Sequence, residues 1–123
     1  MSDERRFTLA EANAELEDLR RHLPVLRQAR RGLIETTAKV TDAVAVDGGG
    51  TEGSDWFRHQ QALKAEVEHL AARGILLRDP EVGLVDFPAE REGRGVFLCW
   101  RLDEPEVAYF HEEDSGFSGR MPW

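Results

Sequence analysis

The spacing of the apolar residues changes at Gly74, and this change limits the folds that are open to the chain. Before Gly74, apolar residues recur every three or four positions, as they do on one face of an α-helix. After Gly74, short apolar runs alternate with turn residues, which is typical of β-strands joined by tight turns. Helices followed by a small antiparallel meander predict an α+β fold and not a βαβ fold. A length of 123 residues fits a single domain.

The helical part begins with a capping box, in which Thr8 and Glu11 bond each other's backbone N–H groups. The apolar spacing predicts a helix from about Leu9 to His22, and Pro24 either kinks it or starts a second helix. The second helix carries a nearly heptad stripe, which predicts that it packs lengthwise on a partner helix. Gly32 inside this helix indicates a close approach between helices. The stripe consists of Leu26, Ala29, Leu33, Thr37, Val40 and Val44.

Composition then divides the chain into four parts. Residues 1–46 form a helical hairpin, residues 47–53 a flexible glycine-rich linker, and residues 54–74 a third helix. Ser54 or Asp55 caps that helix, and Gly74 ends it in a left-handed conformation. Residues 75–123 form a β module and a tail, whose predicted strands are Ile75–Leu77, Leu84–Phe87, Val96–Leu102 and Glu106–His111. Turns are expected at Asp79-Pro80, at Pro88, at Gly93 and Gly95, and at Glu104-Pro105.

Charge and cysteine content exclude several classes of protein. The net charge is −8, and residues 80–115 hold ten carboxylates against three arginines, so a phosphate backbone finds no basic surface there. We therefore expect no nucleic-acid partner. The apolar stretches are too short to cross a bilayer, and the polar N-terminus predicts no secretory signal. A single cysteine cannot form an internal disulfide, which favours a cytoplasmic protein.

Several segments resemble one uncharacterised bacterial family, a domain of unknown function catalogued as twenty-two-oh-three. The segments that carry the resemblance are Phe7–Ala12, Arg78–Ala89, Leu98–Leu102 with Glu104–Glu106, Phe110-His111 and Gly116–Arg120. The most specific motifs in them are Gly83-Leu84-Val85-Asp86-Phe87-Pro88 and Leu98-Cys99-Trp100. The sequence departs from the family pattern at Arg78, Asp103 and Phe110, where the family pattern has lysine, glycine and tryptophan. The resemblance covers nearly the whole chain, supports the fold and marks residues 78–120 as the signature region. It brings no established activity with it.

The pairing of the last two predicted strands decides whether Cys99 and His111 share a face of the sheet. If Leu102 lies opposite Val107, Cys99 faces the side of Phe110 and His111 lies on the other side. If Leu102 lies opposite Glu106, Cys99 sits beside Tyr109 on the same face as His111. In this second register, the thiol and the imidazole could bind a transition metal or act as a nucleophilic pair. The simpler interpretation is that Cys99 is a small buried apolar residue.

Two other groups of polar residues have both a structural and a functional interpretation. Asp86 interrupts an apolar strand and needs a partner, for which Arg101 or Arg120 is a candidate. Glu66 and His69 have the Glu-x-x-His spacing of metal-binding helical bundles. The first two helices supply no second copy, so we expect Glu66 and His69 to be solvated side chains.

Two hypotheses of function follow. The first is a small binding or assembly module that forms a homo-oligomer, or binds a protein partner, through its helices, with Leu33 and Val40 in the interface. The second is a protein that binds a metal or a small ligand in the β module, with Cys99 and His111 as metal ligands. The candidate residues of this site are Asp86, Cys99, Arg101, Glu104, His111 and Arg120.

Overall fold

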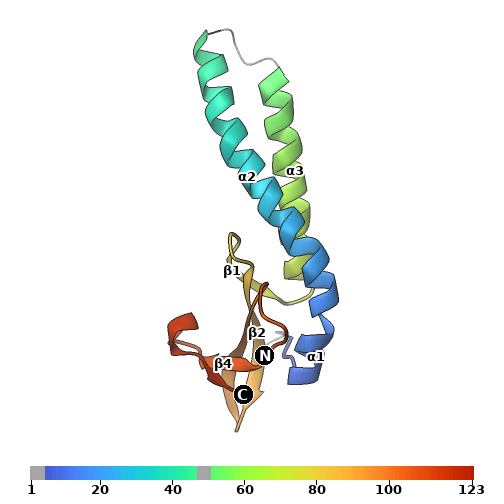
Figure 1. Ribbon diagram of the computed structural model, residues 1–123, viewed down its shortest axis with the longest axis vertical. Coiled ribbons are helices and arrows are strands. Elements are labelled where there is room, and N and C mark those ends of the chain that lie inside the picture. Colours follow the sequence, from blue (N-terminus) through green and yellow to red (C-terminus); the bar gives the residue numbers. More distant parts are fainter. Residues whose placement is uncertain (1–4, 47–50) are drawn as a thin grey trace.

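The computed structural model describes the backbone of residues 5–46 and 51–123 and the side chains of residues 5–39 and 53–123. A long helical arm and a short helix precede an antiparallel sheet, which confirms the α+β prediction (Figure 1). The elements are α1 (Leu9–Ala14), α2 (Leu16–Val46), α3 (Thr51–Ala72), β1 (Leu76–Asp79), β2 (Leu84–Arg91), β3 (Arg94–Arg101), β4 (Tyr109–Glu112), the 3-10 helix η1 (Phe117–Gly119) and β5 (Met121–Pro122).

The sheet is a meander in which each strand pairs with the next one along the chain, in antiparallel orientation. The predicted turn at Pro88 is wrong, because β2 runs through this residue and pairs it with Phe97. Proline fits here because β1 pairs only with the first residues of β2, so no strand requires the missing N–H of Pro88. Its carbonyl accepts a hydrogen bond from the Phe7 N–H at 2.7 Å. The short strand β5 was not predicted.

The boundaries of the first two helices also differ from the prediction. The capping box of Thr8 and Glu11 is confirmed, but α1 ends at Ala14 and α2 then continues through Pro24 without interruption. The predicted boundary at Pro24 is therefore wrong. The side chain of Asn13 ties α1 to the loop before β4, since its Oδ1 accepts from Val107 N at 2.8 Å and its Nδ2 donates to Val107 O at 3.1 Å.

The third helix begins at Thr51, so Ser54 and Asp55 lie inside it and are not its caps. Residues 47–50 of the predicted linker lie outside the described residues, and residues 51–53 belong to α3. The predicted end of the helix is confirmed. Gly74 has a φ of 78°, and the Ile75 N–H donates to Leu70 O at 3.1 Å across the turn.

Helices α2 and α3 lie side by side and antiparallel, and together they form an arm that extends away from the sheet (Figure 1). Leu26 and Ala29 of the predicted stripe are buried, whereas Leu33 is half-buried. The close approach predicted at Gly32 is confirmed, because a Cβ there would lie 2.4 Å from the imidazole of His59. The helix on which α2 packs lengthwise thus belongs to the same chain. The side chains of Val40 and Val44 lie outside the described residues.

The hydrophobic core lies between the start of the helical region and one face of the sheet. Strand alternation points Val85, Phe87, Leu98 and Trp100 to this face, where Trp100 is fully buried. The helical side of the core consists of Phe7, Ala12, Leu16, Leu19, Leu23 and Leu70.

Replacing Leu19 by alanine tests this packing. Because Leu19 is fully buried, Leu19→Ala leaves a cavity and should lower the free energy of unfolding by about 2–5 kcal/mol. Val25 is half exposed on the same helix, so Val25→Ala should change the free energy of unfolding by no more than about 0.5 kcal/mol. Urea denaturation of both variants measures the difference. Equal losses would contradict the assignment of Leu19 to the core.

Candidate functional site

The face of the sheet opposite the core carries the polar residues. Because side chains alternate along a strand, Asp86 of β2 and Cys99 of β3 point away from Phe87 and Leu98. Asp86 lies directly opposite Cys99 in the pairing of β2 with β3. Cys99 is buried but does not belong to the hydrophobic core cluster. The candidate site is therefore separate from the hydrophobic core.

The pairing of β3 with β4 settles the register that the sequence left open. Cys99 lies opposite Tyr109, and Phe97 lies opposite His111. This is the second of the two registers, so Cys99 and His111 share a face with Asp86. One donor atom from each of Asp86, Cys99 and His111 lies within 4.8 Å of the other two. The three side chains form a carboxylate–thiol–imidazole cluster, to which we refer as the strand triad.

The strand triad is almost completely buried, with exposed fractions of 2% for Asp86, 1% for Cys99 and 3% for His111. The partner of Asp86 is Arg78, whose Nε donates to Oδ2 at 2.8 Å, and not Arg101 or Arg120. The Nε2 atom of His111 lies 3.0 Å from the same oxygen. The other oxygen, Asp86 Oδ1, is buried and has no hydrogen-bond partner among the described residues. An unpaired carboxylate oxygen is costly to bury, so it requires an explanation.

The hydrogen bonds of His111 restrict its protonation. Its Nδ1 lies 2.7 Å from the carbonyl oxygen of Glu112, and a carbonyl only accepts, so Nδ1 carries a hydrogen. In the neutral ring, Nε2 then has a lone pair that faces the Asp86 carboxylate at 3.0 Å. Two acceptors face each other unless a second proton or a metal ion lies at Nε2. A histidine that binds a metal usually donates its other N–H to a carbonyl or carboxylate, as His111 does.

The thiol of Cys99 is held in its protonated form. Burial, with the negative charge of the Asp86 carboxylate as the next cause, raises the pKa of Cys99 to about 12. A thiol with this pKa is a poor nucleophile at neutral pH, which argues against an activated Cys–His pair in the metal-free protein. A bound metal would reverse this, since it removes the proton from a coordinating thiol.

A cavity of about 410 Å³ opens beside the strand triad. Asp86, His111 and Arg78 line its wall, and Glu113 and Asp114 stand on the side of the tail. Leu84, Ser115, Gly116 and Phe117 complete the lining, so the tail borders this face of the sheet. The three carboxylates outnumber the one arginine, and the cavity therefore favours a cation over an anion.

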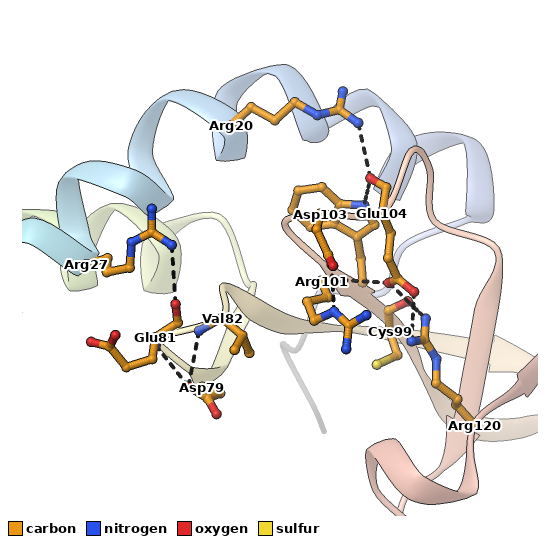
Figure 2. A network of polar contacts seen from close by, with 11 residues as sticks. Arg20, Arg27, Asp79, Glu81, Val82, Cys99, Arg101, Asp103, Glu104 and Arg120 are labelled. Atoms are coloured by element: carbon orange, nitrogen blue, oxygen red, sulfur yellow. Dashed lines mark hydrogen bonds and ion pairs between the residues drawn. The ribbon is translucent and has the colours of Figure 1, made fainter.

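The other predicted site residues lie in a polar network that includes Cys99, whose backbone carbonyl accepts a hydrogen bond from Arg120 Nη2 at 3.4 Å (Figure 2). Arg120 donates to both carboxylate oxygens of Glu104 at 2.9 and 3.0 Å, and its guanidinium stacks over Tyr109 at 4.3 Å. Arg101 donates to Asp103 at 2.6 Å, and its backbone N–H donates to Glu104 at 2.8 Å. Since Arg120 is paired with Glu104, its structural role is to fasten the tail to the sheet.

The two aromatic residues of the tail, Phe117 and Trp123, differ in their packing. Trp123 docks on the domain. Its ring packs edge to face against Phe110, with ring centroids 5.6 Å apart, and its backbone N–H donates to Ala108 O at 2.8 Å. Phe117 stays partly exposed beneath the guanidinium of Arg120, 4.6 Å from the ring centroid.

The prediction that Glu66 and His69 are solvated side chains is wrong. Glu66 Oε2 lies 2.7 Å from His22 Nδ1, and His69 Nε2 lies 2.7 Å from Asp18 Oδ2, so both reach across to α2. The signal for this second cluster was present in the sequence. Asp18 and His22 are four residues apart, which places them on one face of a helix, as does the three-residue spacing of Glu66 and His69.

Fold and site together define a small α+β protein whose C-terminal sheet carries a buried cluster of potential metal ligands. Residues 5–123 match the family model DUF2203, described as an uncharacterised conserved protein, and the chain belongs to this family. The resemblance seen in the sequence is thereby confirmed. No curated protein and no solved structure matches the chain significantly. None of the described helices combines the length and the hydropathy that crossing a bilayer requires.

The raised pKa of Cys99 predicts a dependence of stability on pH in the metal-free protein. The folded state binds the thiol proton more tightly than the unfolded chain, whose thiol has a pKa of 9.0. The contribution of Cys99 is therefore complete below about pH 9 and is lost as the pH rises towards about 12. Urea denaturation between pH 8 and 11 should show a fall in the free energy of unfolding. Cys99→Ala should show a smaller fall, and equal slopes would contradict the burial of a protonated thiol.

Proposed function

We propose that the protein binds a divalent transition-metal ion of the zinc class at Asp86, Cys99 and His111. The observation that supports this most strongly is the convergence of a carboxylate, a thiol and an imidazole within 4.8 Å in a buried site. Asp86 Oδ1 has no hydrogen-bond partner within the described part of the chain. These are the ligand types that zinc takes in proteins. Around a tetrahedral zinc ion, neighbouring ligand atoms lie about 3.3–3.7 Å apart, so small side-chain movements would complete the site.

The competing explanation is a purely structural ion pair between Asp86 and a protonated His111, supported by Arg78. This arrangement accounts for Asp86 Oδ2, which already receives Arg78 and faces His111. Among the described residues, it leaves Asp86 Oδ1 without an ion-pair partner, and Cys99 serves only as a thiol donor to the Asp86 carboxylate. A metal ion would engage Oδ1, the thiolate and His111 Nε2 together, and the bond from His111 Nδ1 to Glu112 O would orient the ring. Metal binding therefore explains more of the observed contacts.

Three protein ligands would leave one position of a tetrahedral ion open. The cavity that Asp86 and His111 line would give water or a small ligand access to that position. Such a site binds a ligand on the metal, and it also suits the activation of a bound water molecule. We further propose a cytoplasmic location, because the single cysteine stays a thiol and is suited to a reducing compartment.

Substitution with Co²⁺ tests this site with a signal that only Cys99 can give. Since the chain has one cysteine, a thiolate-to-Co²⁺ charge-transfer band in the near ultraviolet can arise only from Cys99. We expect the metal-depleted protein to develop this band with one equivalent of Co²⁺, and Cys99→Ser to lack it. Asp86→Asn should weaken Co²⁺ binding by about 100-fold or more. Even the loss of a residue that only hydrogen-bonds a metal ligand lowers metal affinity by about 10–100-fold.

Asp103→Asn is the matched control, because it makes the same change at an exposed carboxylate that pairs only with Arg101 and lies outside the strand triad. It should retain the band with unchanged affinity. Absence of a charge-transfer band at saturating Co²⁺ in the wild-type protein would refute metal binding at Cys99.

A second candidate function is assembly through the helical arm, and the exposed apolar residues of the arm favour it. Ile34 on α2 and Phe57 on α3 are each 55% exposed. Because Leu26 and Ala29 are buried within the same chain, an interface would use these exposed residues in place of the predicted heptad stripe. Large apolar side chains that stay exposed on a protruding arm are typical of protein contacts.

This candidate predicts that Phe57→Glu lowers the oligomeric state while the domain stays folded, because it places a charge in an apolar interface. Val82→Glu is the control, since Val82 is comparably exposed but lies in the turn between β1 and β2. Sedimentation at high protein concentration, with circular dichroism to verify folding, measures the difference. A wild-type protein that is monomeric at high concentration would exclude this function.

A further inference from the structure

A second cluster of potential metal ligands lies where the helical arm meets the rest of the protein. It joins the first turns of α2 to the last turns of α3, which run side by side at this point (Figure 1). Helix α2 contributes Asp18 and His22, and helix α3 contributes Glu66 and His69. We refer to these four residues as the helix tetrad. Donor atoms of Asp18, His22 and His69 lie within 4.8 Å of one another.

The spacing of the helix tetrad along the sequence explains its convergence. Residues three or four apart project from the same face of a helix, so each helix presents one carboxylate and one imidazole to its neighbour. His22 Nδ1 lies 2.7 Å from Glu66 Oε2, and His69 Nε2 lies 2.7 Å from Asp18 Oδ2. A third contact, His22 Nε2 to Asp18 Oδ1 at 3.5 Å, closes the group. Each carboxylate thus faces the imidazole of the opposite helix.

The contacts of His22 attract a positive charge, although only the contact with Glu66 is a hydrogen bond. Both of its ring nitrogens face carboxylate oxygens, and ionised carboxylates only accept hydrogen bonds. A neutral imidazole has one hydrogen and can satisfy only one of the two contacts. Either the ring carries two hydrogens or a cation takes the place of one of them.

The neighbouring ring of His69 favours the metal. The two imidazoles are stacked, with centroids 3.9 Å apart and an angle of 21° between their planes. If both rings were protonated, two positive charges would face each other at this short distance, which costs energy in a partly buried site. Two neutral imidazoles can stack without this repulsion, and a rotation of one ring about its χ2 bond would direct a nitrogen lone pair of each ring towards one metal ion.

The net charge of the helix tetrad and its neighbours matches one divalent cation. Arg73 donates to the buried Glu15 at 2.6 Å and neutralises it, and it lies 3.6 Å from Asp18. Asp18, which Arg21 and Arg73 approach only to 3.6 Å, and Glu66 then remain as two negative charges.

We propose that the helix tetrad binds one divalent first-row transition ion through the imidazoles of His22 and His69 and the carboxylate of Asp18, while Glu66 orients the ring of His22 through Nδ1. The nitrogen and oxygen ligands suit Zn²⁺, Co²⁺, Fe²⁺ or Mn²⁺ and exclude ions that require thiolates. Side chains of the tetrad are partly exposed, so an ion can enter from solvent. The bound ion joins α2 to α3 at the base of the arm and stabilises the folded state. This site is independent of the strand triad, with which it shares no residue.

Titration of metal-depleted Cys99→Ser protein with Co²⁺ tests the proposal without any contribution from sulfur. We expect visible d–d absorption that saturates and a rise in melting temperature on the order of 10 °C at about 100 times the dissociation constant. Adding Glu66→Gln and His69→Gln should weaken Co²⁺ binding by more than about 100-fold and abolish the rise. If this protein fails to fold by circular dichroism, Asp18→Asn, which keeps the size of the side chain, replaces it and should weaken binding similarly.

The matched control adds Glu68→Gln and His59→Gln to Cys99→Ser. It changes the same two residue types on the same helix at positions outside the tetrad. We expect Co²⁺ binding equal to that of Cys99→Ser alone. Equal affinities in the tetrad variant and this control would overturn the proposal, as would the absence of d–d absorption at millimolar Co²⁺ in Cys99→Ser. Neither result affects the charge-transfer band that tests the strand triad, so the two proposed metal sites can be refuted independently of each other.

Discussion

The pairing of β3 with β4 is the constraint on which the candidate site depends. Phe110 is buried with Leu98 on the core face, because the register places these two residues opposite each other. A slip of one residue would turn Phe110 away from the core and bring His111 into it, at a cost of about 1.5–3 kcal/mol for the lost apolar burial alone. The same register places Cys99 and His111 on the opposite face. Packing of one apolar residue against the helices thus fixes the geometry of the polar cluster on the other side of the sheet.

The polar face is closed by charged pairs and aromatic rings and not by a second layer of helices. Arg120 joins the tail to Glu104, and its guanidinium covers Tyr109 and Phe117. Arg78 covers Asp86 in the same way from β1, while its guanidinium stacks on Phe97 at 5.1 Å. Arginine is suited to this task, because its flat cation pairs with a carboxylate and lies on an aromatic ring at the same time. The closure shields the strand triad from bulk water but leaves a cavity beside it, which a continuous apolar layer would have filled.

Periodicity and turn chemistry predicted the fold class, the end of the third helix at Gly74 and the meander order, since these depend on local signals. The break at Glu15 and the continuation through Pro24 were not predictable from the same signals, because tertiary contacts such as the pairing of Asn13 with Val107 override local preference. The register of β3 and β4 was left open for a similar reason, since either pairing gives a plausible turn. The residues of the strand triad were named from the sequence, but Arg78 was missed as the partner of Asp86. The helix tetrad was missed because its convergence depends on the offset between α2 and α3, which the spacing within each helix does not determine.

The direction of the arm relative to the sheet is set at its base, where apolar and polar contacts meet. At the base, Leu70 belongs to the core together with Leu19 and Leu23. Farther along the arm, Leu33 is only half-buried, and the hydroxyl of Thr36 donates to the carbonyl of Gly32. Apolar contacts alone allow two helices to rotate and slide, since they are not directional. The short contacts between Asp18 and His69 and between His22 and Glu66 are directional, and they lie on the helix faces that meet just beyond the core. Any cation that replaces protons in these contacts therefore acts at the base of the arm, where a small change in geometry would be amplified along the length of the two helices.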